Sequence, residues 1–123
     1  MHISADPLII KTLDTFRLGV LQARIFCQSS GPDQKSMLNS SLKDIKKKYN
    51  LEDISKISTI SESRKAYKAL GNDPSRYRPS SESLMRRVVQ GLELYSINNV
   101  VDILNLISVQ SGFSIGGYNT ESI

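Results

Sequence analysis

Hydrophobic residues recur at helical intervals most clearly in residues 34–49. Intervals of four, three and four residues put these side chains on one face, which predicts an amphipathic helix. Asp33 is suited to be its N-cap, and the lysines near its end complement the helix dipole. The hydrophobic stripe consists of Leu38, Leu42, Ile45 and Tyr49.

Two more helices are predicted around a turn at Asn72–Pro74. The first begins near Ser63 and ends at Leu70, where Gly71 can adopt the left-handed conformation that closes many helices. The second begins at Pro79–Ser81, because serines are frequent at helix starts. The hydrophobic positions of these two helices are Tyr67 and Leu70, and then Leu84, Met85, Val88, Val89 and Leu92.

A last helix is predicted over residues 97–109, with Ser96 as its candidate cap and Gly112 after its end. Phe113–Ile115 then resembles the start of a strand that turns at Gly116 and Gly117. Residues 16–26 show neither clean alternation nor a clean helical stripe, so periodicity leaves them open between strand and helix. Residues 51–58 are predicted to be a loop with a short turn.

The chain has the size and composition of one globular domain. It has 123 residues, of which 39% are hydrophobic and 23% charged. No hydrophobic run is long enough to span a bilayer, and residues 1–14 lack the pattern of a secretory signal. The single cysteine, Cys27, excludes an internal disulfide and fits a reducing cytoplasm; we expect it to be buried and inert.

Positive charge is concentrated in the middle of the chain. Residues 43–87 contain twelve Lys and Arg against six Asp and Glu, a difference of +6, whereas the whole chain carries +4 and the remainder therefore −2. This distribution is typical of a surface that faces a polyanion. For Lys46, Lys47 and Lys48 a solvated helix surface is the simpler interpretation, because adjacent residues on a helix point in different directions.

Local motifs give little indication of catalysis. His2 is the only histidine and lies at a terminus. No group of Cys, His and acidic residues has metal-ligand spacing, so no cofactor is expected. Gly116–Gly117 lacks the lysine of a phosphate-binding loop. Glu93 and Asp102 are candidate general bases, although acids at helix ends more often interact with the helix dipole.

Four ordered blocks in the second half carry a family resemblance: AYKALG, DPSRYRPSSE, SINNVVD and GGYN. Together they resemble the tRNA-binding and editing domain of the phenylalanyl-tRNA synthetase beta subunit, in particular its freestanding relatives. The resemblance implies an α+β fold with helices packed on a mixed β-sheet, in which residues 16–26 form a buried strand. Residues 1–123 are then a single domain that corresponds to the first half of the family domain, so we expect it to be incomplete.

The same resemblance implies a site. In the family the domain hydrolyses the ester of a mischarged aminoacyl-tRNA. Its pocket corresponds here to Asn98 and Asn99, as catalytic candidates at a helix start, and to Gly116, Gly117 and Tyr118 as substrate pocket. Helix-start amides can stabilise an oxyanion, and glycines let a backbone approach a ligand. Synthetase versions commonly carry a histidine where this chain has Gly116, which puts hydrolysis in doubt.

The remaining candidates would bind RNA. Arg76 and Arg78 flank Tyr77, which puts a stacking ring between two phosphate-binding groups. Arg86 and Arg87 lie off the hydrophobic stripe of their predicted helix and join this set. An alternative interpretation puts Tyr77 in the core, with the arginines holding the turn against helix ends.

The expected function is therefore tRNA binding linked to editing of mischarged aminoacyl-tRNA in the cytoplasm. If the chain is active it is an aminoacyl-tRNA deacylase, and it is not a complete phenylalanine-tRNA ligase. A non-catalytic RNA-binding module is the main alternative, and a protein-interaction module is the third. The expected partners are tRNA and either a missing second half or another chain that covers the helix at Ile97. No membrane partner is expected.

Overall fold

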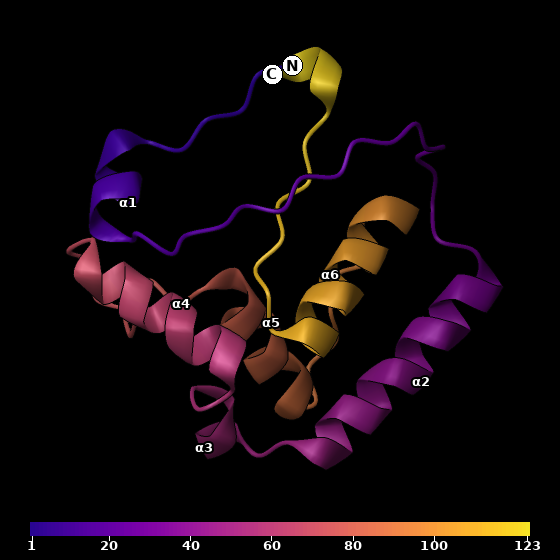
Figure 1. The fold of residues 1–123 in the computed structure, drawn as a ribbon. Helices are drawn as coiled ribbons and strands as arrows, with labels where there is room; N and C mark the ends of the chain where they lie inside the picture. Colours follow the sequence, from indigo (N-terminus) through magenta and orange to yellow (C-terminus); the bar gives the residue numbers. More distant parts are fainter.

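The computed structural model describes all 123 residues, and it is entirely helical (Figure 1). Helices α2, α5 and α6 pack against one another, α3 packs on α5, and α4 is joined to α5 by a turn. The elements are α1 (Pro7–Thr12), α2 (Pro32–Lys48), α3 (Leu51–Ile54), α4 (Ser58–Ala69), α5 (Ser80–Val89), α6 (Asn99–Ser111) and the 3-10 helix η1 (Thr120–Ser122).

The core lies where α2–α6 meet. Each of these five helices contributes at least one side chain to a single buried cluster, and burying each such side chain stabilises the fold by about 1.5–3 kcal/mol. The cluster consists of Ile45, Ile54, Ile60, Met85, Val88 and Val109. Residues before α2 contribute nothing to it.

The helices predicted from periodicity are confirmed in α2, α4, α5 and α6, with boundaries that differ by a few residues. Gly71 and Gly112 have φ of +89° and +76°, as expected of glycines that close helices. The caps differ from expectation. Helix α2 begins one residue before Asp33, and Asn98 rather than Ser96 caps α6. The short helices α1 and α3 were not predicted.

The predicted mixed β-sheet is wrong, because the chain contains no strand. Residues 16–26 are extended between α1 and α2, and no backbone hydrogen bond joins residues 17–25 to any other part of the chain. Phe113–Ile115 is also extended without a paired neighbour. A strand needs a neighbouring strand to pair its backbone groups, and neither segment has one; the carbonyls of Phe26 and Phe113 accept only from side chains.

The segment between α1 and α2, residues 13–31, is therefore named the extended segment, and its hydrophobic side chains are largely exposed. Leu21 and Phe26 are 93% and 89% exposed, so the expectation of a buried strand here fails. Cys27 is exposed as well, contrary to expectation. None of the helices has the length and hydrophobicity needed to cross a bilayer.

Candidate functional site

Asn98 and Asn99 stand at the start of α6, where each side chain is hydrogen-bonded. Asn98 Oδ1 accepts from the Val101 N–H at 2.9 Å, which is the usual role of an N-cap asparagine. Asn99 bonds instead to the extended segment. Its Nδ2 donates to the Phe26 carbonyl oxygen at 2.8 Å, and its Oδ1 accepts from the Gln28 N–H at 2.9 Å. The helix start and the extended segment are thus joined through one side chain.

A buried carboxylate reinforces this junction one turn further along α6. Asp102 Oδ2 accepts from the hydroxyls of Ser30 at 2.5 Å and Ser96 at 3.2 Å, and Oδ1 accepts from the Ile97 N–H at 2.9 Å. Burial raises the pKa of the Asp102 carboxyl, but these hydrogen bonds together with one from the Asn98 backbone outweigh it and hold the pKa below 3.8. Asp102 is therefore an ionised structural group with its acceptors occupied, which argues against the general-base interpretation.

Gly116, Gly117 and Tyr118 follow α6 and run beside it. A Cβ built on Gly117 would lie 2.8 Å from Leu104 Cδ1, which places this backbone against the helix. Leu104 is six residues beyond Asn98, about 9 Å along the helix axis. A Cβ at Gly116 would lie 3.0 Å from Tyr118 Cε2, so the tyrosine ring fills the space that a side chain at 116 needs. Tyr118 is itself exposed.

The block DPSRYRPSSE forms the turn between α4 and α5. Asp73 organises it, because its Oδ1 accepts from the Ser75 N–H at 2.9 Å and its carbonyl accepts from the N–H groups of Arg76 and Tyr77. Tyr77 is 54% exposed, so it is not a core residue. The Arg76 guanidinium lies 5.4 Å from the centre of the Tyr77 ring. The guanidinium groups of Arg76 and Arg78 form no hydrogen bond or ion pair with the protein.

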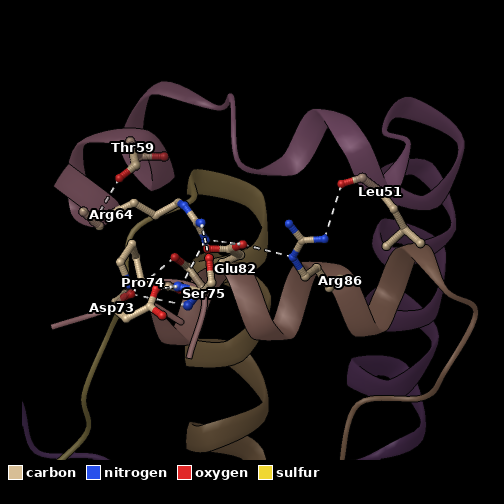
Figure 2. Close-up of polar contacts among 11 residues, drawn as sticks. Leu51, Thr59, Arg64, Asp73, Pro74, Ser75, Glu82 and Arg86 are labelled. Atoms are coloured by element: carbon tan, nitrogen blue, oxygen red, sulfur yellow. Dashed lines mark hydrogen bonds and ion pairs between the residues drawn. The ribbon is translucent and has the colours of Figure 1, made fainter. Parts of the chain in front are cut away.

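Behind this turn a buried glutamate is held by two arginines, as Figure 2 shows. Glu82 on α5 is fully buried, and its carboxylate accepts from Arg64 Nη1 at 2.9 Å and from Arg86 Nε at 3.0 Å. Arg64 also reaches the Pro74 carbonyl and the Ser75 hydroxyl, both at 3.3 Å. The network connects α4, the turn and α5, and it fixes the backbone from which Arg76, Tyr77 and Arg78 project.

The two arginine candidates on α5, Arg86 and Arg87, both bond to other groups of the protein. Arg86 pairs with Glu82 and reaches the Leu51 carbonyl at 3.5 Å. Arg87 Nε donates to the Glu93 carbonyl at 2.6 Å, and its guanidinium lies 4.6 Å from the centre of the Tyr95 ring. Of the predicted RNA-binding cations, those on the turn project freely and those on α5 are engaged in holding the fold.

Two concave surfaces were not anticipated from the sequence. A polar cavity of about 270 Å³ lies beside the turn and is lined by Ser55, Ser61, Arg64, Lys65, Lys68 and Pro74. A groove of about 580 Å³ separates α2 from the connection between α5 and α6. The helical spacing of the α2 lysines is visible in the sequence. Only the packing of α2 on α5 and α6 shows that these lysines border a groove.

The second half of the chain, which holds Asn98, Asn99, residues 116–118 and the arginine candidates, matches a known family. The family model described as the B3/4 domain matches residues 62–123. No curated protein and no solved structure matches the chain. The matched residues are 62 of 123, half of the chain, and they leave out α2 and the extended segment.

Proposed function

The chain belongs to the B3/4 domain family, a domain found in the phenylalanyl-tRNA synthetase beta subunit, and from this premise we propose that it binds tRNA through the turn between α4 and α5. The observation that carries the proposal is the arrangement of Arg76, Tyr77 and Arg78. The exposed Tyr77 ring lies beside the Arg76 guanidinium, Arg78 follows it in the sequence, and neither guanidinium forms a hydrogen bond or ion pair with the protein. This combination suits stacking with an unpaired base together with phosphate contacts.

The network behind the turn supports the same proposal. Glu82 and Arg64 fix the backbone of residues 73–76 before any ligand arrives. A binding surface that is already ordered loses less conformational entropy on association. The family membership directs the choice of ligand to tRNA, and Arg76 and Arg78 on the turn, with Lys68 on α4, supply positive charge that no ion pair engages.

The test is the salt dependence of tRNA binding by the whole chain and by Arg76→Ala/Arg78→Ala. Each phosphate contact changes the slope of log K against log salt by about −0.7 to −0.9, so removing two contacts should make the slope shallower by about 1.5. Arg24→Ala/Lys11→Ala is the matched control, because it removes the same charge outside the matched residues. Equal slopes for the two double variants would contradict the proposal.

Hydrolytic editing is the second candidate function, and the position of residues 116–118 beside α6 favours it. The Gly117 backbone packs on Leu104, and the helix start at Asn98 lies about 9 Å further along the helix axis. Two features oppose efficient hydrolysis. Tyr118 rather than a histidine fills the space next to Gly116, and Asn99 is occupied by the extended segment.

We therefore expect weak or undetectable loss of the amino acid from labelled aminoacyl-tRNA at saturating protein. Where activity is found, Asn98→Ala should reduce the rate of hydrolysis and leave tRNA affinity nearly unchanged. Asn50→Ala is the matched control substitution, because Asn50 makes no capping side-chain bond. Rapid hydrolysis that survives Asn98→Ala would place the catalytic group elsewhere.

A further inference from the structure

The groove between α2 and the α5–α6 connection has properties that the proposed function does not use. Its volume of about 580 Å³ is in the range of ligand-binding clefts. Its floor is hydrophobic and includes Leu42, Val88 and Leu94, while cations stand along one wall. Helix α2 supplies that wall and lies outside the matched residues 62–123.

The cations of this wall form a row. Lys35, Lys43 and Lys46 all line the groove from α2, and none of the three forms an ion pair. They span eleven residues of helix, about 16 Å. Lys46 reaches across the groove, since its Nζ would lie 2.9 Å from a Cβ built on Gly91. The groove therefore presents three lysines without an ion-pair partner at successive points along its length.

The opposite wall carries an aromatic ring. Tyr95 lines the groove and is 68% exposed. Arg87 lies over the ring and bonds to the Glu93 carbonyl, so it holds the connection in place. The acids of the groove leave a net positive charge, because three lysines of α2 line it against the two carboxylates of Glu93 and Asp102. The Asp102 oxygens already accept hydrogen bonds from Ser30, Ser96 and Ile97.

We infer that this groove binds a single-stranded segment of RNA, with phosphates along the lysines of α2 and a base stacked on Tyr95. A cationic groove that follows a backbone and an aromatic ring that accepts a base are the two parts of single-strand binding sites. In a duplex the bases are already paired and stacked, so none is free to stack on the ring. The inference rests on the proposed function and adds a second contact surface, separate from Arg76, Tyr77 and Arg78.

The experiment compares the whole chain with Lys35→Ala/Lys43→Ala/Lys46→Ala. The probe is a labelled single-stranded oligoribonucleotide of about 10 residues, with a duplex of the same sequence beside it. The triple variant should bind the single strand at least 10-fold more weakly, with a salt slope shallower by about 2. Lys11→Ala/Lys47→Ala/Lys56→Ala removes the same charge from exposed positions that do not line the groove, and it should change affinity much less.

Substitution of Tyr95 tests base stacking separately from charge, because it changes the ring and leaves every charged group in place. Tyr95→Ala should weaken single-strand binding by about 5- to 100-fold, as expected for loss of one stacked base. Tyr95→Phe keeps the ring and should restore the affinity. Thermal melts of each variant check that the fold is intact.

The outcomes separate the two proposals. Equal losses in both triple variants, or equal affinity of the whole chain for the single strand and the duplex, would overturn the groove as a single-strand site. If tRNA binding depends on Arg76 and Arg78 but not on the lysines of α2, the groove proposal fails and the proposed function stands. If the oligoribonucleotide binds while tRNA does not, the proposed function fails instead.

Discussion

Asn99 Nδ2 lies 2.8 Å from the carbonyl oxygen of Phe26, a contact between residues 73 positions apart in the sequence. Together with the Asn99 bonds to Gln28, it holds the end of the extended segment against the start of α6. We expect Asn99→Ala to release this segment while the core remains folded, because the segment contributes nothing to the core. Faster amide exchange at Gln28 and faster tryptic cleavage after Arg24 measure the release. Asn98→Ala, which removes only a cap, should lower stability by about 1 kcal/mol without exposing Arg24 to faster cleavage.

Glu82→Gln should be strongly destabilising. It removes the charge that compensates Arg64 and Arg86, whose side chains are only 23% and 21% exposed. Breaking a buried pair in this way costs about 3 kcal/mol, since the remaining cations stay desolvated. Glu62→Gln is the control, because its pair with Lys65 is exposed and worth less than about 1 kcal/mol. Urea unfolding of both variants gives the comparison, and equal stabilities would mean that Glu82 has little role in holding the turn.

Asp102 should make stability depend on pH in the acid range. Its pKa in the folded protein lies below the ordinary value of 3.8, so the carboxylate stabilises the fold at pH above that value. The contribution is lost as the pH falls through the folded pKa. Asp102→Asn should therefore lower the free energy of unfolding by about 1.5–3 kcal/mol at pH 7. The difference from the wild-type chain should stay constant down to about pH 5 and shrink below pH 4. A difference that grows toward low pH would show the opposite sign of shift.

Gly112 and Gly71 both have positive φ, but they differ in their surroundings. A Cβ at Gly112 would collide with the Thr59 side chain, whereas a Cβ at Gly71 would meet nothing within 4 Å. We expect Gly71→Ala to cost about 1 kcal/mol from backbone strain alone. Gly112→Ala should cost clearly more, because Thr59 must also move and its bond to the Ser111 carbonyl lies at the same place. Thermal melting compares them; equal losses would show that Thr59 moves freely.

The sequence predicted the elements whose signals are local. The periodicity of residues 34–49 and 97–109, and the glycines at 71 and 112, depend on neighbours within a few turns, and α2, α6 and both glycine conformations agree. The strands failed because pairing is a relation between distant segments. Periodicity left residues 16–26 open and only the family resemblance implied a strand there, yet no backbone hydrogen bond pairs this segment with another. No short-range pattern shows whether a partner exists.

The candidate residues also divide into those that local sequence signals indicate and those whose role depends on contacts between distant segments. The exposed ring and cations at Arg76, Tyr77 and Arg78 follow from a turn whose chemistry can be recognised in the sequence. The pair of Arg86 with Glu82 spans one helical turn, a local spacing that the sequence contains. The bond from Arg64, 18 residues away, depends instead on how the turn places α4 beside α5. The occupation of Asn99 by Phe26 and Gln28 depends on a contact over more than 70 residues, and no motif indicates it.

The separation between bonded residues also bears on the order in which the molecule assembles. Arg64 and Glu82 are 18 residues apart, whereas the bonds from Asn99 and Asp102 to the extended segment close loops of more than 70 residues. Long loops close more slowly and at a greater entropic cost than short ones. We expect α4, the turn and α5 to form early, and the extended segment to dock last. Docking does not cover Leu21 and Phe26, which are 93% and 89% exposed in the folded chain, so both side chains stay available to other chains before and after folding.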